Sequence, residues 1–265
     1  MLTLHTSKII TEVHNGLARL TLNNPARHNA ISLEMWQALG EAMEAFNLDP
    51  TVKVVILQGA GGKSFAAGAD ISEFDTKRAN AEQRMDYARI SQRAQDAMKG
   101  FSKPLIAMIQ GYCIGGGLVI ALACDVRFTT PTSRFGIPAA KLGLGYEHSG
   151  VVNLASQVGP AHAADILFSG RQFDATEAKT MGLVNFVVED VELAQRVDEY
   201  ANNIANNAPL TVKAAKASLK TYLGYGLLPT SKQAEDLISA CFDSEDYSEG
   251  RNAFREKRSP NFKGC

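Results

Sequence analysis

The stretch Gly111-Tyr112-Cys113-Ile114-Gly115-Gly116-Gly117-Leu118-Val119-Ile120-Ala121-Leu122-Ala123-Cys124-Asp125 decides the fold. It follows an apolar run, Leu105–Ile109, that predicts a short buried strand, and it ends in an apolar segment long enough for a helix. Consecutive glycines are costly because glycine loses the most backbone freedom on folding. Because glycines have no side chain, only their backbone N–H groups face a molecule bound there, at the positive end of a helix dipole. This arrangement suits a developing oxyanion, but a tight turn where helix and strand backbones touch fits the same residues.

The same region could be considered as a membrane span. Residues 104–124 contain no charged side chain, and an uncharged run of this length is about long enough to cross a bilayer. Pro104, Gln110 and four glycines interrupt the run, and charges are evenly spread over the rest of the chain. We therefore expect a buried strand–loop–helix unit and no membrane contact.

Composition narrows the class of protein. The chain has 265 residues and a net charge of −1, so it can bury a large core and has no nucleic-acid-binding character. The N-terminal residues lack the apolar stretch of a secretory signal, which favours a cytoplasmic protein. The histidines are dispersed, and the cysteines have no CxxC spacing, so neither a disulfide framework nor a metal site is indicated. The cysteines are Cys113, Cys124, Cys241 and Cys265.

Strands and helices are expected to alternate on both sides of the glycines. Asn15-Gly16 between two apolar runs predicts a hairpin, and Ser32 is a plausible N-cap for the helix that follows. The expected strands are residues 9–13, 17–22, 52–58, 125–128 and 184–188; the expected helices are residues 33–48, 81–100 and one ending at 158. Residues 133–138 are expected to be a connection, and the chain after 191 to be helical. The pattern is typical of an α/β domain with a helical C-terminal segment.

The Gly62-Lys63-Ser64 triplet after a strand suggests a phosphate-binding loop. That motif requires a glycine five positions before Gly62, where Leu57 stands. No helix signal follows Ser64 directly. We therefore exclude nucleotide binding by this loop.

Four segments together resemble the enoyl-CoA hydratase/isomerase (crotonase) family. They are residues 65–71 (Phe-Ala-Ala-Gly-Ala-Asp-Ile), residues 103–107 with Gly111-Tyr112, the three glycines 115–117, and Arg134-Phe135-Gly136. The resemblance extends from the first hairpin to the closing residues 259–263, Ser-Pro-Asn-Phe-Lys. It implies an α/β fold built as a spiral of ββα turns. Residues 1–200 would form an acyl-CoA-binding core, and residues 201–265 a helical trimerisation segment.

The resemblance also implies the partners. The substrate would be an acyl-CoA thioester whose carbonyl oxygen becomes an enolate or another oxyanion, and the assembly would be a homotrimer or homohexamer. Coenzyme A would enter as part of the substrate, with no separate cofactor and no metal. Loss of one oxyanion donor typically costs ~10²–10³ in rate.

Individual roles follow from the resemblance position by position. The two oxyanion donors would be the backbone N–H groups of Ala67 and Gly116. Arg27 and His28 would line the path of the pantetheine arm. The adenine side of the pocket would be formed by Ala66, Gly68, Asp70 and Ile71. Phe262 and Lys263, from this or a neighbouring subunit, would close over the phosphate end of coenzyme A. Ordinary solvated charge is the alternative for Arg27 and Lys263, and a helix N-cap is the alternative for Asp70.

The chain departs from the family at the acid–base pair. The hydratases use two glutamates, at positions where this chain has Val119 and Ala139. Neither side chain transfers protons, so ordinary enoyl-CoA hydration is not expected. The next candidates are Tyr146 and Glu147, with His148 beside them. By the resemblance, methylmalonyl-CoA decarboxylases carry a tyrosine at the position of Tyr146, and dienoyl-CoA isomerases carry an acid at that of Glu147. The match to the decarboxylases is partial, because they have a histidine where this chain has Ala69.

The lead interpretation gives Glu147 the role of a single base in a double-bond isomerase or related lyase. As a base it should lie in a partly apolar pocket between Leu144 and Val151. The rivals are C–C cleavage by a decarboxylase or retro-Claisen hydrolase, with Tyr146 involved, and a non-catalytic acyl-CoA-binding protein. The alternative for the whole segment of residues 142–150 is a polar loop that faces solvent. A nucleophile pair of Ser149 and His148 is disfavoured, because no acid is present to orient the histidine.

Overall fold

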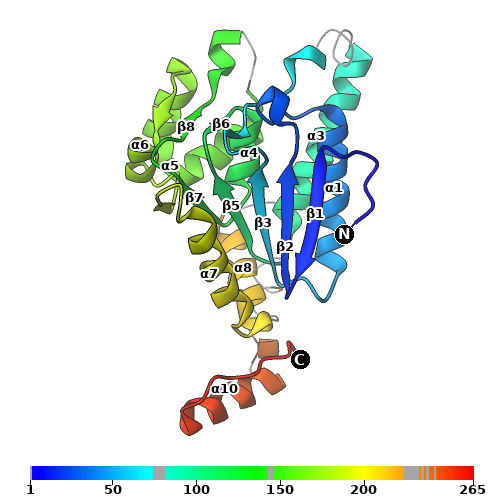
Figure 1. The fold of residues 1–265 in the computed structure, drawn as a ribbon, viewed down its shortest axis with the longest axis vertical. Helices are drawn as coiled ribbons and strands as arrows, with labels where there is room; N and C mark the ends of the chain where they lie inside the picture. The colour runs from blue at the N-terminus through cyan, green and yellow to red at the C-terminus, as the bar shows by residue number, and fades with distance from the viewer. Residues whose placement is uncertain are drawn as a thin grey trace.

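The computed structural model describes residues 2–73, 81–142, 146–223, 233, 236, 239–241 and 243–265. A six-stranded sheet has the order β1-β2-β3-β5-β7-β10, and a four-stranded sheet has the order β4-β6-β8-β9. Helices cover both faces of the larger sheet (Figure 1). The expected α/β class is confirmed.

The larger sheet contains β1 (Ile9–His14), β2 (Leu17–Leu22), β3 (Val54–Gly59), β5 (Leu105–Ile109), β7 (Val126–Thr129) and β10 (Phe186–Val187). The smaller sheet contains β4 (Ser64–Ala66), β6 (Tyr112–Ile114), β8 (Arg134–Gly136) and β9 (Phe173–Asp174). The α-helices are α1 (Leu33–Leu48), α3 (Ala81–Gly100), α4 (Gly116–Leu122), α5 (His148–Ser169), α6 (Ala175–Thr180), α7 (Leu193–Ala205), α8 (Pro209–Tyr222) and α10 (Glu245–Glu256). Short 3-10 helices span Pro25–Arg27, Ile71–Glu73 and Pro138–Leu142.

The first hairpin forms as the sequence predicts. Asn15 and Gly16 have φ angles of 50° and 82°, which match the two central residues of the turn that best fits the twist of antiparallel strands. The strands pair from His14↔Leu17 to Ile9↔Leu22. From β2 onward the neighbours β3, β5 and β7 run parallel.

The burial of β3 on both faces explains why its sequence is almost uniformly apolar. Val55 and Leu57 belong to the main core, which also contains the inner faces of α1 and α3. Val54 and Ile56 point to the opposite face, where they pack with residues of α7. Parallel strands covered on both faces lack the polar alternation of half-exposed strands.

Helix α7 crosses the expected domain boundary at residue 200. Its residues Leu193, Val197 and Ala201 are buried against the sheet with Val54 and Ile106. The division into residues 1–200 and 201–265 therefore falls inside a helix that is part of the core.

The smaller sheet was missed from the sequence, because its strands have only two or three residues. Residues 133–138, expected to be a connection, contain β8, which pairs with β6 from Tyr112↔Arg134 to Ile114↔Gly136. The helix expected to end at residue 158 continues as α5 to Ser169, through a kink at Gly159 (φ 78°) and Pro160.

The apolar stretch 104–124 forms β5, β6 and the seven-residue helix α4. Within the ranges given above, no helix has both the length and the apolar character to cross a membrane. The strand–loop–helix interpretation of this stretch is therefore confirmed.

Helix α8 is attached to the core by two buried lysines. The Lys216 ammonium donates to the carbonyl oxygen of Lys103 and to the Asp125 carboxylate, at 2.5 and 2.8 Å. The Lys220 ammonium donates to the carbonyl oxygen of Phe101 at 2.6 Å. The opposite face of α8 is apolar and uncovered in the single chain, since Leu219 and Tyr222 are 64% and 86% exposed.

We expect this exposed apolar face to be buried between subunits. Light scattering at micromolar concentration should give the mass of a trimer or hexamer, and Tyr222→Glu should shift the population toward smaller species. A wild-type protein that is monomeric under these conditions would contradict the expected assembly.

Candidate active site

The candidate site lies where the loops after β3 and β5 meet. Each of these parallel strands continues into a short strand of the smaller sheet, β4 and β6, and these two strands pair in parallel. The loop after β4 contains Gly68 and Ala69, and β6 is followed by Gly115 and by Gly116, where α4 begins. Carboxyl ends of parallel strands meet at one edge of a sheet, where ligands of α/β proteins commonly bind.

Two backbone donors without acceptors lie next to each other at this edge. Gly116 is the first residue of α4, so its N–H has no partner within the helix. A Cβ atom placed on Gly116 would lie 3.6 Å from the nitrogen of Ala69. Within the described ranges, neither N–H has a hydrogen-bond acceptor. Two bare donors at one point can bind the oxygen of a polarised carbonyl group.

Ala69, and not Ala67, supplies the second of these donors. The N–H of Ala67 donates to the carbonyl oxygen of His28 at 3.0 Å, so it is already committed within the fold. Gly68, between the two alanines, has a φ of 108° that only glycine adopts readily. The backbone turns there, and the N–H of Ala69 lies beside Gly116. The expected role of Ala67 is therefore corrected.

The glycines 115–117 have separate tasks. A Cβ on Gly117 would lie only 2.2 Å from the carbonyl oxygen of Ala66, so this position requires glycine for close packing of α4 on β4. Gly115 adopts a positive φ of 50°. A Cβ on Gly116 would have no neighbour closer than 3.6 Å, and this residue presents the bare N–H. The close approach thus occurs at Gly117, whereas Gly116 has an N–H without an acceptor in the described structure, as the expected oxyanion role requires.

Three of the residues expected to contact coenzyme A, Arg27, His28 and Asp70, lie in the segments next to these donors. Arg27 lies 3.6 Å from the Asp70 carboxylate, and Asp70 is 7% exposed. Asp70 also accepts hydrogen bonds from the N–H and the hydroxyl of Ser72, so it caps the short helix Ile71–Glu73, in agreement with the alternative interpretation. The His28 ring packs edge-on against Tyr112 with ring centroids 6.0 Å apart.

Asn29, which the sequence did not single out, holds this cluster in place. It is fully buried and has a positive φ of 55°. Its side-chain amide donates to the carbonyl oxygens of Ala60 and Ser64 and accepts from the N–H of Asn24, at 2.7–2.9 Å. These bonds attach the loop that carries Arg27 and His28 to the strands of the site.

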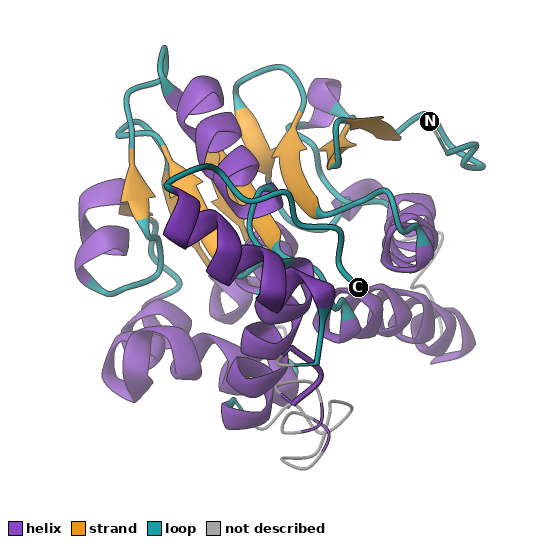
Figure 2. Cartoon of the chain, turned by 90° about the horizontal axis from the view of Figure 1, so that it is seen from below, coloured by secondary structure: helices purple, strands orange, loops and turns teal. Residues whose placement is uncertain are grey.

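The C-terminus, two residues after Lys263, lies at the end of the molecule opposite the loops of the site (Figure 1), and the view from below shows it in front of the helices (Figure 2). The N–H of Lys263 donates to the Asp246 carboxylate at 2.7 Å. Lys263 also lines a cavity with Pro50 and Pro104, which precede the starts of β3 and β5. One chain therefore does not bring Phe262 and Lys263 to Arg27, and only the expectation of a contact from a neighbouring subunit remains.

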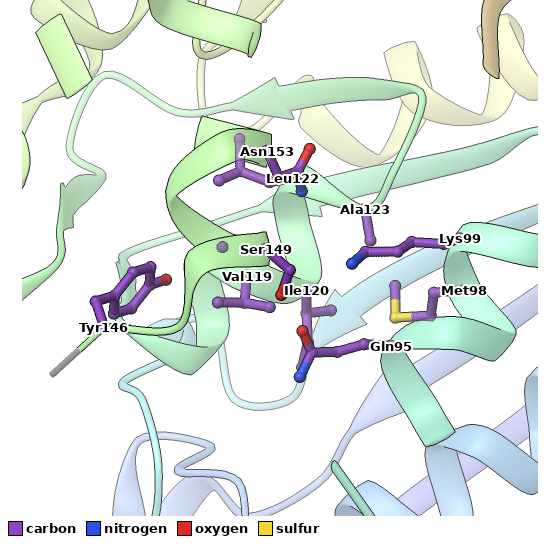
Figure 3. Close-up of a pocket in the computed structure, with 11 residues that line it drawn as sticks. Gln95, Met98, Lys99, Val119, Ile120, Leu122, Ala123, Tyr146, Ser149 and Asn153 are labelled. Atoms are coloured by element: carbon purple, nitrogen blue, oxygen red, sulfur yellow. The ribbon is translucent and has the colours of Figure 1, made fainter. Parts of the chain in front are cut away.

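A narrow pocket lies between α3, α4 and α5 (Figure 3). Its lining residues are Gln95, Met98, Lys99, Val119, Ile120, Leu122, Ala123, Tyr146, Ser149, Gly150 and Asn153. Val119 lies about one helical turn after Gly116. The free volume of the pocket, about 10 Å³, has room for about one water molecule. No aspartate or glutamate is among these described lining residues.

Of the expected proton-transfer groups, only Tyr146 reaches the pocket. Its ring packs against Gly150, and its hydroxyl points toward Val119 (Figure 3). The hydroxyl oxygen is buried and has no hydrogen-bond partner in the described structure. Burial raises the pKa of Tyr146 above its usual value, because the charged phenolate loses its hydration.

Glu147 and His148 have exposed side chains at the start of α5. The expectation that Glu147 occupies a partly apolar pocket is wrong for the single chain, and Leu144 lies outside the described residues. Ser149 lines the pocket, whereas Ala139 is buried in the short helix Pro138–Leu142 and does not.

Metal ligands and reactive thiols do not gather in the described parts of the chain. No group of three or more His, Cys, Asp or Glu side chains there could hold a metal ion. Cys113 and Cys124 are buried, and burial raises the pKa of the Cys124 thiol to about 12. These thiols therefore remain protonated and inert.

Comparison with known proteins finds one matching family model and similar proteins over nearly the whole chain. The family model described as enoyl-CoA hydratase/isomerase matches residues 12–265. The chain is 33% identical to a crotonyl-CoA hydratase of Syntrophomonas wolfei over 96% of this chain and 97% of that protein. It is 36% identical to an (E)-benzylidenesuccinyl-CoA hydratase of Thauera aromatica over 97% and 99%. The crystal structure of an enoyl-CoA hydratase/carnithine racemase from Magnetospirillum magneticum has a TM-score of 0.92, with 41% identity over 98% of this chain and 97% of that one.

Proposed function

The chain belongs to the enoyl-CoA hydratase/isomerase family, and we propose that it stabilises the enolate of an acyl-CoA thioester at the N–H groups of Ala69 and Gly116. The observation that carries the proposal is the pair of bare donors beside a pocket. As the carbonyl oxygen gains negative charge, both hydrogen bonds strengthen in a site from which water is largely excluded. Coenzyme A enters as part of the substrate.

Ordinary hydration is not the reaction that this pocket favours. Addition of water to a double bond requires one group to activate the water and one to deliver a proton to carbon. Val119 and Ala139 stand where the two glutamates are expected, and no carboxylate lines the described pocket. The relatives named as hydratases support the thioester substrate and the fold of the site.

Cleavage of a C–C bond next to the thioester fits these residues better, with decarboxylation as the simplest case. The electron pair of the breaking bond moves into the thioester, carbon dioxide leaves, and the enolate oxygen accepts hydrogen bonds from Ala69 and Gly116. No base is needed to start this step. A proton must then reach the α-carbon, from the Tyr146 hydroxyl or from solvent. Burial keeps Tyr146 protonated, so its proton is available to the strongly basic enolate carbon, whereas the phenolate that a base would need is disfavoured.

A double-bond isomerase with Glu147 as its base is the second candidate. Glu147 precedes the first turn of α5, but its side chain makes no capping hydrogen bond there. The carboxylate is therefore not committed to the helix, and it lies one residue from Tyr146. This mechanism requires Glu147 to turn from solvent into the pocket when substrate binds.

Tyr146→Phe separates these candidates. We expect it to slow decarboxylation of a malonyl-type thioester by ~10² or more, because the pocket loses its proton donor, while acyl-CoA affinity measured by calorimetry stays within about threefold. Glu147→Gln is the matched variant and should leave decarboxylation unchanged.

Proton exchange at the α-carbon of a saturated acyl-CoA in heavy water, followed by NMR, reports on the isomerase. Exchange lost in Glu147→Gln, without decarboxylation by the wild type, would establish the second candidate. Binding of acyl-CoA with neither activity would leave a binding protein, and absence of binding would refute the whole proposal.

A further inference from the structure

The far end of the pocket carries a cation that the proposed chemistry at the thioester does not use. Lys99 and Gln95 lie four residues apart on α3, so they share one face of that helix. Both line the pocket, and in Figure 3 the Lys99 ammonium points toward α4 and α5. Both are half-buried.

Neither side chain has a partner of its own in the described structure. Among the described residues, no hydrogen bond or ion pair involves the Lys99 ammonium or the Gln95 amide, whereas Arg89 and Arg93 on the same helix pair with Asp86 and Glu44. None of the described lining residues supplies a carboxylate to balance the charge of Lys99. A partly desolvated ammonium is stabilised most by an anion that also accepts hydrogen bonds.

Helix α4 sets the distance between this cation and the oxyanion donors. Gly116, the donor, and Ala123, which lines the pocket near Lys99, are seven residues apart, or ~10 Å along a helix. An extended carbon chain advances ~1.25 Å per bond. A six-carbon acyl chain that ends in a carboxylate, together with one hydrogen bond from that carboxylate to Lys99, therefore spans about the distance from the donors to Lys99.

We propose that the pocket selects acyl-CoA thioesters whose acyl chain of about six carbons ends in a carboxylate, which Lys99 and Gln95 bind. This inference rests on the proposed function, because the thioester must occupy the donor pair for the chain to follow α4. The free volume is small, so the chain must displace a flexible side chain. Met98, a buried but unbranched side chain that lines the same stretch, is the one that must move.

The test compares two six-carbon thioesters, hexanoyl-CoA and the CoA monothioester of hexanedioic acid, by calorimetry. We expect the wild-type protein to bind the carboxylate-ended thioester at least tenfold more tightly. Lys99→Met should abolish this preference and leave hexanoyl-CoA binding unchanged. Arg89→Met, which removes the same charge from an exposed position on the same helix, should keep the preference.

Lys99→Arg keeps the charge and should also retain the preference. Because only the carbonyl oxygen of Lys99 takes part in anchoring Lys220, substitution of the side chain preserves that contact. Equal binding of both thioesters to the wild type would overturn this inference and leave the proposed function intact. A preference that survives in Lys99→Met would overturn the assignment of Lys99. Absence of binding by either thioester would refute the proposed function itself.

Discussion

Hydration of crotonyl-CoA by this protein is expected to be at least ~10⁴-fold slower than hydration by an enzyme that carries both glutamates. Each general acid or base typically contributes ~10²–10⁴ to the rate, and Val119 and Ala139 supply neither group. Burial disfavours the Tyr146 phenolate, so this side chain does not act as the base that activates water. Loss of the enoyl absorbance over time measures this rate directly.

Restoring the carboxylates tests the same point in the opposite direction. Val119→Glu combined with Ala139→Glu should recover part of the hydration activity, limited by the missing contacts that would orient the new side chains. Val119→Gln combined with Ala139→Gln is the matched control and should recover none. Wild-type turnover near the typical ~10 s⁻¹ of enzymes would show that another group replaces the pair, and the exclusion of ordinary hydration would be withdrawn.

Gly117→Ala should cost ~10²–10³ in enolate-forming activity and about 1–3 kcal/mol of stability. The added methyl group would lie 2.2 Å from the carbonyl oxygen of Ala66, so α4 must move away from β4. That displacement separates Gly116 from Ala69, and loss of one aligned oxyanion donor typically has an effect of this size. Thermal unfolding and decarboxylation of a malonyl-type thioester measure the two effects.

Gly116→Ala provides the control for stability. Its methyl group would have no neighbour closer than 3.6 Å, so the variant should unfold at nearly the wild-type temperature. If Gly117→Ala were as stable and as active as the wild type, the close approach of α4 and β4 would not be what aligns the two donors.

The sequence predicted those parts of the fold that depend on local pattern. The hairpin at Asn15-Gly16, the N-cap at Ser32 and the buried strand β3 follow from turn chemistry, capping and apolar runs, and all are present. The smaller sheet was not predictable in this way, since strands of two or three residues carry almost no periodicity. Its strands are recognisable only from their pairing partners.

For the candidate site, the sequence indicated the two loops that the structure brings together, but not which backbone N–H groups lack acceptors. The glycines located one donor at Gly116, whereas the choice between Ala67 and Ala69 depended on the hydrogen bond between Ala67 and His28. Asn29 was overlooked because its three hydrogen-bonding partners are up to 35 residues away in the chain. The orientations of Tyr146 into the pocket and of Glu147 toward solvent likewise depend on how α5 begins, which adjacent residues in a sequence do not reveal.

A crystal structure of the protein with a saturated, unreactive acyl-CoA would test the central claim most directly. We predict that the thioester oxygen lies within about 2.7–3.2 Å of the backbone nitrogens of both Ala69 and Gly116, while the N–H of Ala67 keeps its hydrogen bond to His28. A thioester oxygen that contacts Ala67 instead, or that faces solvent while the acyl-CoA is fully bound, would contradict the account.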